Sequence, residues 1–137
     1  MLGLCGWAVS RGRGEGNMCV WKCLPTMRCQ VLAYLEWPTT DLWHMKLHAE
    51  PVLGNKVVLV GGDPAGVLRI FNLDLDDICK DAKKGGSKAA IKASNTLDDV
   101  GASFSTPARH VALSQDLRHL VSVNGSNLIC LWQLPSS

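Results

Sequence analysis

Apolar residues from about residue 31 onward fall into short blocks that are separated by turn-forming residues. Residues 30–37 (QVLAYLEW) and 42–49 (LWHMKLHA) are strand-like, and the turn-prone sequence PTTD lies between them. Residues 56–62 (KVVLVGG) form a continuous apolar run rich in β-branched side chains. Such a run is typical of a strand that is covered on both faces. The pattern therefore predicts an all-β fold.

The second half of the chain contains an internal repeat. Residues 57–73 (VVLVGGDPAGVLRIFNL) align with residues 118–134 (RHLVSVNGSNLICLWQL). Three pairs of apolar positions coincide in this alignment: Val60 with Val121, Phe71 with Trp132, and Leu73 with Leu134. Antiparallel meanders that end in an aromatic residue are typical of β-propeller blades. The sequence therefore predicts WD40 β-propeller blades, with the two aromatic residues in the core.

The repeat sets the expected domain boundaries. We expect residues 31–137 to form a partial WD40 propeller, with one blade over 31–79, an inserted loop over 80–106, and a second blade over 107–137. Residues 1–30 contain the glycine-rich, charged stretch SRGRGEGN and show no clear periodicity, so we expect an unassigned, flexible segment there. Because a propeller needs at least four blades, two blades imply a larger assembly or a truncated product.

Composition and charge exclude several classes of function. Among the 137 residues, 14 Lys and Arg face 12 Asp and Glu, and this balance argues against direct nucleic-acid binding through bulk charge. No apolar run approaches the roughly 18 residues of a membrane span. The charges near the start follow the apolar patch instead of preceding it, so the order is not that of a secretory signal. The expectation is a non-secreted protein that does not enter membranes.

The six cysteines allow two interpretations. They are Cys5, Cys19, Cys23, Cys29, Cys79 and Cys130. Three of them, together with His44 or His48, offer a zinc-binding set, although the close paired spacing of a zinc finger is missing. The crowding of four cysteines near the start is unlike a secreted disulfide scaffold, which favours reduced thiols in an intracellular protein. A small metal-binding or redox protein remains an alternative.

No enzyme motif is present in the sequence. A phosphate-cradling glycine loop before a helix, a nucleophile elbow and a helical metal pair are all missing. The prediction is a protein that is not an enzyme and that carries no cofactor and no resident metal. The lysines between residues 80 and 92 are interleaved with small residues, which favours a solvated loop over a phosphate-binding patch.

The stretch DLWHMKL, residues 41–47, places Trp43 beside His44. Adjacent residues in a strand point to opposite faces, so both side chains cannot enter the same core. The pair is either half-buried sheet or part of a binding rim.

Residues 31–137 resemble the Polycomb-group WD40 family of extra sex combs, called EED in animals and fertilization-independent endosperm in plants. The resemblance rests on DLWHMKL, VVLVGGDPAGVLRIFNLDLDD, PARHVALSQD and LICLWQL, in that order. It implies a seven-bladed propeller in Polycomb repressive complex 2, a histone H3 methyltransferase. The implied partners are the methylated H3 tail, the SET-domain catalytic subunit and the other subunits of that complex, and the implied location is the nucleus.

The resemblance also implies a binding site for trimethyl-lysine. Trp43 falls on a tryptophan of the aromatic cage, and His44 falls on a second cage position. Lys46 falls on a basic position beside the peptide groove, and Arg109 falls on an arginine near the cage. The two remaining cage aromatics belong to earlier blades. His44 is a weaker wall than tyrosine, because a protonated imidazole repels a cation.

Other interpretations of these residues stay open. Trp43 can serve sheet packing alone, and Arg109 can pair with a surface carboxylate. The whole chain can be a generic WD40 interaction module without a preference for methylated lysine, or a propeller fragment that has no function alone.

Overall fold

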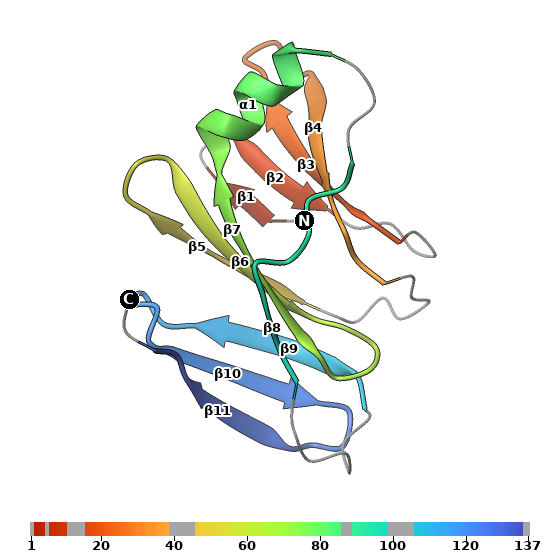
Figure 1. The fold of residues 1–137 in the computed structure, drawn as a ribbon, viewed down its shortest axis with the longest axis vertical. Coiled ribbons are helices and arrows are strands. Elements are labelled where there is room, and N and C mark those ends of the chain that lie inside the picture. The colour runs from red at the N-terminus through yellow and green to blue at the C-terminus, as the bar shows by residue number, and fades with distance from the viewer. Residues whose placement is uncertain are drawn as a thin grey trace.

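The computed structural model describes residues 2–4, 6–10, 16–38, 46–85, 89–98 and 106–135. These residues form three antiparallel sheets and one helix, which agrees with the predicted all-β class (Figure 1). The sheets follow one another along the long axis of the molecule, in the order of the sequence (Figure 1). Within the described ranges, no helix has the length and apolar character needed to cross a membrane.

Three strands of the first sheet lie within residues 1–30, where a flexible segment was expected. The strands of this sheet, paired in the order of the sequence, are β1 (Leu2–Leu4), β2 (Trp7–Ser10), β3 (Met18–Cys23) and β4 (Cys29–Leu35). The described residues of the segment 1–30, which showed no clear periodicity in the sequence, thus form regular strands. Met18 and Val20 alternate with less buried neighbours and enter the core completely, as the period of a half-buried strand requires. This alternation was too short to detect beside the glycine-rich stretch.

The second sheet lies between the other two. Its strands are β5 (Leu47–Val52), β6 (Lys56–Gly62), β7 (Leu68–Asp74) and β8 (Asn95–Leu97), again paired in the order of the sequence. Leu59 of β6 belongs to the core against the first sheet, whereas Val60 belongs to the core against the third sheet. Successive side chains of β6 thus enter two different cores, so the prediction of a strand covered on both faces is confirmed.

The third sheet completes the described structure. Its strands are β9 (Ala108–Leu113), β10 (His119–Asn124) and β11 (Ile129–Gln133), with β10 in the middle. Leu120 is fully buried, and Trp132 packs partly buried against the same core, where its indole Nε1 donates a hydrogen bond to Ser122 Oγ at 3.1 Å. Phe71, the matching aromatic residue of the repeat, is fully buried in the other core.

The region expected to be an inserted loop contains regular structure. Helix α1 (Leu75–Lys83) begins before this region and extends into it, and Asp74 caps the helix by accepting hydrogen bonds from the backbone N–H groups of Asp76 and Asp77. Leu75 and Ile78 bury one face of the helix, which packs against β4 of the first sheet (Figure 1). Farther on, Ile91 forms a parallel bridge with Leu35. The described part of the insertion thus packs on the first sheet through Ile91 and pairs with the second sheet through Asn95–Leu97, while its described lysine residues are exposed.

The two halves of the internal repeat form the same hairpin. In the β6–β7 turn, Asp63 Oδ1 accepts hydrogen bonds from the backbone N–H groups of residues 65 and 67. In the β10–β11 turn, Asn124 Oδ1 accepts from the N–H groups of residues 126 and 128. The fourth residue of each turn has positive φ: 88° at Gly66 and 61° at Asn127. The aligned residues thus adopt equivalent conformations.

A close backbone contact fixes the second sheet against the third. Gly62, at the end of β6, has no room for a side chain, because an added Cβ would overlap the Cβ and carbonyl oxygen of Ala108 on β9. The backbone N–H of Ala108 donates to the carbonyl oxygen of Asp63 at 3.2 Å. The first strands of the sheets also lie next to one another, β1 beside β5 and β5 beside β9. The three sheets are therefore stacked around their first strands.

We predict that Gly62→Ala destabilises the protein, because the new methyl group forces β6 and β9 apart. Overpacking of this kind costs about 1–3 kcal/mol, measured as the free energy of unfolding in urea. Gly125→Ala is the matched control, since its added Cβ would meet ordinary van der Waals contacts of 3.5 Å or more. The control is expected to change stability by less than about 0.5 kcal/mol. Equal stability of the two variants would contradict the close contact.

Candidate functional site

Two of the four predicted site residues meet in the structure. Lys46 immediately precedes β5, and its backbone N–H donates to the carbonyl oxygen of Arg109 on β9 at 2.8 Å. Trp43 and His44 lie outside the described residues, so their prediction remains untested. The hydrogen bond brings the end of DLWHMKL next to the start of ARHVALSQD, although the two stretches are far apart in the sequence.

Arg109 lies against the β10–β11 turn. Its Nε is 3.5 Å from the position that a Cβ on Gly125 would occupy, and the Gly125 N–H donates to the carbonyl oxygen of Pro107 at 2.9 Å. Among the described residues, Arg109 forms no ion pair with a carboxylate. Arg109 is half-buried and Lys46 is exposed, and their backbone hydrogen bond places two cationic residues at this end of the second and third sheets.

Asp63 connects the turn, the next strand and the neighbouring sheet. Its side chain is almost completely buried, with 3% exposure. Oδ1 accepts the two turn hydrogen bonds, at 2.8 Å from the N–H of residue 65 and 3.0 Å from that of residue 67. Oδ2 lies 3.2 Å from Nη2 of Arg69 and forms an ion pair with it. A buried carboxylate needs such partners, because it has lost its hydration.

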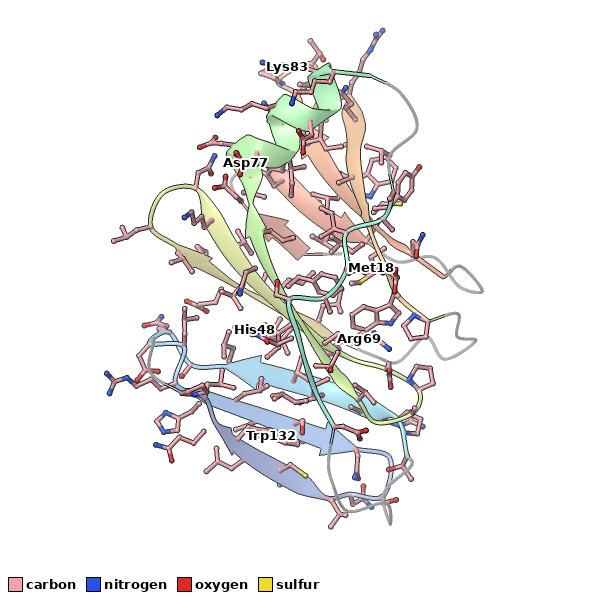
Figure 2. The ribbon with its side chains drawn as sticks, viewed as in Figure 1. Met18, His48, Arg69, Asp77, Lys83 and Trp132 are labelled. Carbon is pink, nitrogen blue, oxygen red and sulfur yellow. The ribbon has the colours of Figure 1, made fainter. Side chains whose placement is uncertain are left out.

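Arg69 in turn lies over an aromatic pair. Its guanidinium carbon is 5.9 Å from the ring centroid of Trp37, which is stacked on Phe71 with centroids 6.0 Å apart. Figure 2 shows Arg69 and Met18 on the same side of the molecule, where the first two sheets meet. Arg69 Nε and Trp37 Nε1 are both buried and have no hydrogen-bond partner in the described part of the chain. Arg69 therefore links the second sheet to the first.

We call Lys46, Asp63, Arg69 and Arg109 the Asp63 rim. It lies where β6 ends and where β5, β7 and β9 begin. The sequence pattern did not identify the pairing of Asp63 with Arg69. The internal repeat offered one signal for this pairing. Asn124 accepts the turn hydrogen bonds in one copy without carrying a charge, whereas the other copy has the carboxylate of Asp63, which a nearby cation would balance.

The Asp63 rim is rich in hydrogen-bond donors. Lysine and arginine side chains only donate hydrogen bonds, and Asp63 already uses both oxygens inside the protein. Since Asp63 neutralises Arg69, Lys46 and Arg109 provide the remaining positive charge. Such a surface suits a ligand that presents backbone carbonyls or carboxylates.

The described residues do not gather a metal site. No group of three or more His, Cys, Asp or Glu side chains in the described ranges is close enough to hold a metal ion. His48, one of the two histidines in the alternative zinc-binding set, places Nε2 3.2 Å from Oε2 of Glu50. His44, the other, lies outside the described residues.

A groove lies away from the rim, between α1 and β4. It has a volume of about 630 Å³ and is lined mainly by β4 residues 30–34 together with Ile78, Asp81, Ala82, Ala89 and Ile91. These side chains are mostly apolar and include only one acid.

We predict that Asp63→Asn lowers stability while preserving the turn. The amide oxygen can still accept both N–H groups, as Asn124 does, but Arg69 loses its counter-charge. The expected cost is about 1–3 kcal/mol, measured by urea denaturation. Asp63→Ala should cost more, because it also leaves the two turn N–H groups without an acceptor. If Asp63→Asn is as stable as the native protein, the ion pair does not stabilise the rim.

Comparisons with models of known protein families and with characterised proteins found no match for this chain. The basis for assigning a function is therefore the stacked sheets and the geometry of the Asp63 rim.

Proposed function

We propose that the chain is a WD40 scaffold and histone reader, and that its three sheets are blades of a β-propeller. Three features support this: each sheet pairs its strands in sequence order, the first strands lie next to one another, and the repeat forms equivalent hairpins. The observation that carries the proposed site is the hydrogen bond between Lys46 and Arg109. It joins the two stretches that the resemblance to the extra sex combs family assigns to one peptide-binding rim.

The third sheet offers a surface for a further blade. Ile129 and Leu131 lie on the face of β11 opposite Trp132, and they are 73% and 70% exposed. In the described residues the sheet ends at β11, so the outer backbone groups of that strand have no strand partner. An apolar face beside an open strand edge is what a neighbouring propeller blade would cover. A closed propeller also needs more blades than these three sheets supply.

The proposed ligand is the histone H3 tail with a trimethylated lysine. In this proposal Trp43 and His44 form part of an aromatic cage, because a quaternary ammonium is attracted to ring faces and has no hydrogen atoms to donate. Lys46 and Arg109 donate hydrogen bonds to backbone carbonyls of the peptide. The chain would then support the SET-domain methyltransferase of Polycomb repressive complex 2, in the nucleus, in gene silencing.

A second candidate is a generic WD40 interaction module. The observation that favours it is the position of Trp37, the tryptophan next to Arg69 in the described structure. Trp37 is only 3% exposed and stacks inside the core, so it offers no open ring face to a ligand. A generic module would bind peptides at the Asp63 rim without distinguishing trimethylated from unmodified lysine.

We predict that the protein binds an H3 peptide with trimethyl-lysine more tightly than the unmodified peptide, and that Trp43→Ala removes the preference. A cation–π contact of about 2 kcal/mol corresponds to a loss of roughly thirtyfold in affinity, measured by calorimetry. Trp21→Phe is the matched control, because Trp21 lies on the first sheet and its Nε1 donates to Ser10. Equal binding of both peptides by the folded native protein would favour the generic module.

We also predict that His44→Tyr strengthens the preference for trimethyl-lysine by a few-fold. A phenol ring keeps the electron-rich face that attracts a cation, and it carries no positive charge near pH 6–7. A substitution that leaves both peptide affinities unchanged would place His44 outside the cage.

A further inference from the structure

Two cysteines face each other across the β3–β4 hairpin. Cys23 and Cys29 are directly opposite in the antiparallel register, and their Sγ atoms are 3.4 Å apart. Both residues are exposed at the end of the hairpin, on either side of the turn formed by residues 24–28. In the β6–β7 and β10–β11 hairpins, the last pairs before the turns hold Gly62 with Leu68 and Val123 with Ile129. Of these three hairpins, only the β3–β4 hairpin has two facing thiols.

The backbone geometry of this pair suits a disulfide. The Cys23 N–H donates to the carbonyl oxygen of Gly6, on the β2 side, at 2.6 Å, while the next residue, Leu24, donates across the hairpin to Arg28 at 2.8 Å. Cys23 and Cys29 thus form a non-hydrogen-bonded pair, in which the Cα atoms approach to about 4.5 Å and the side chains lie closest. Disulfides span Cα separations of about 4.4–6.8 Å, so oxidation requires little backbone movement.

We propose that Cys23 and Cys29 are a redox-active dithiol, which exchanges with a glutathione-type disulfide to close a reversible disulfide across the β3–β4 hairpin. This site is independent of the proposed reader function.

The exchange proceeds in two balanced steps. The Cys29 thiolate attacks one sulfur of the glutathione disulfide, which forms a mixed disulfide and releases one glutathione thiolate. Cys23 then loses its proton and attacks the Cys29 sulfur, which expels the second glutathione thiolate. The two protons from the cysteines are taken up by the two thiolates. The protein dithiol is thereby oxidised by two electrons and the glutathione disulfide is reduced to two thiols.

The hydrogen bond between the two thiols supports this order of attack. The hydrogen bond with Cys29 raises the pKa of the Cys23 thiol above its usual value. A thiol with a raised pKa suits the resolving role, so the proposal assigns the second attack to Cys23. The sulfur of Cys79 is separate from this pair, since it lies 3.9 Å from Nζ of Lys22 and is half-buried.

The test is equilibration of the full-length folded protein with mixtures of reduced and oxidised glutathione, followed by acid quenching, alkylation and peptide mass spectrometry. We expect a peptide pair linked through Cys23 and Cys29, with the loss of two hydrogen atoms, that is fully reversed by excess reduced glutathione. Cys23→Ser should instead retain one glutathione on Cys29, because the resolving thiol is missing. Cys79→Ser is the matched control and should form the link as the native protein does.

If oxidation perturbs the fold, a second measurement on the reduced protein tests the proposal. A trivalent arsenical such as phenylarsine oxide needs two adjacent thiols, so it should bind the reduced native protein and Cys79→Ser with equal affinity. Cys23→Ser and Cys29→Ser should each lose that binding. The proposal is overturned if no link between Cys23 and Cys29 forms at any glutathione ratio, or if arsenical binding persists in both single variants.

Discussion

The close approach of β6 to β9 at Gly62 and Ala108 determines how the rest of the molecule is arranged. Because Gly62 has no side chain, the backbone of β9 can lie against the end of β6, and the carbonyl oxygen of Asp63 can accept the Ala108 N–H. The same approach sets Arg109 beside Lys46 at the start of β5. The stacking of two sheets and the positions of two rim cations thus follow from one steric constraint.

The Asp63 side chain also helps to fix the positions of the sheets in this region. A tight turn needs only a neutral acceptor, as Asn124 shows in the third sheet. The carboxylate at residue 63 does more, because its second oxygen holds Arg69 over Trp37, which belongs to the core between the first two sheets. Asp63 therefore connects all three sheets, through its backbone to the third and through Arg69 to the first. A neutral residue could form the turn but would leave Arg69 without its counter-charge.

Much of the fold was predictable, because the strands of the second and third sheets have clear patterns. A run such as KVVLVGG can remain apolar throughout only if both faces are covered, and this is how the structure places β6. In the first sheet, β4 was anticipated as residues 30–37, whereas β1, β2 and β3 were not, because these strands are short and the glycine-rich stretch lies between β2 and β3. Helix α1 was missed because its apolar face is short and depends on the neighbouring strand β4 for burial.

The candidate site was predictable only in part, since it depends on contacts between residues far apart in the sequence. Family resemblance, not spacing, selected Lys46 and Arg109 together, and the backbone hydrogen bond between them became visible only in the folded chain. The pairing of Asp63 with Arg69 and the stacking of Trp37 on Phe71 have no local signature. The facing positions of Cys23 and Cys29, in contrast, follow from local sequence. Once β3 is recognised, a hairpin turn between the two cysteines places them opposite each other.

The dithiol and the Asp63 rim lie at opposite ends of β4. Cys29 begins this strand, whereas Trp37 follows its end and contacts Arg69. Seven strand residues at about 3.3 Å each separate the two ends by roughly 20 Å. Between them, β4 is held by β3, by helix α1 and by the bridge from Leu35 to Ile91. A strand fixed on both sides does not shift when a short turn at one end is closed, so oxidation of the dithiol should leave the geometry of the rim unchanged.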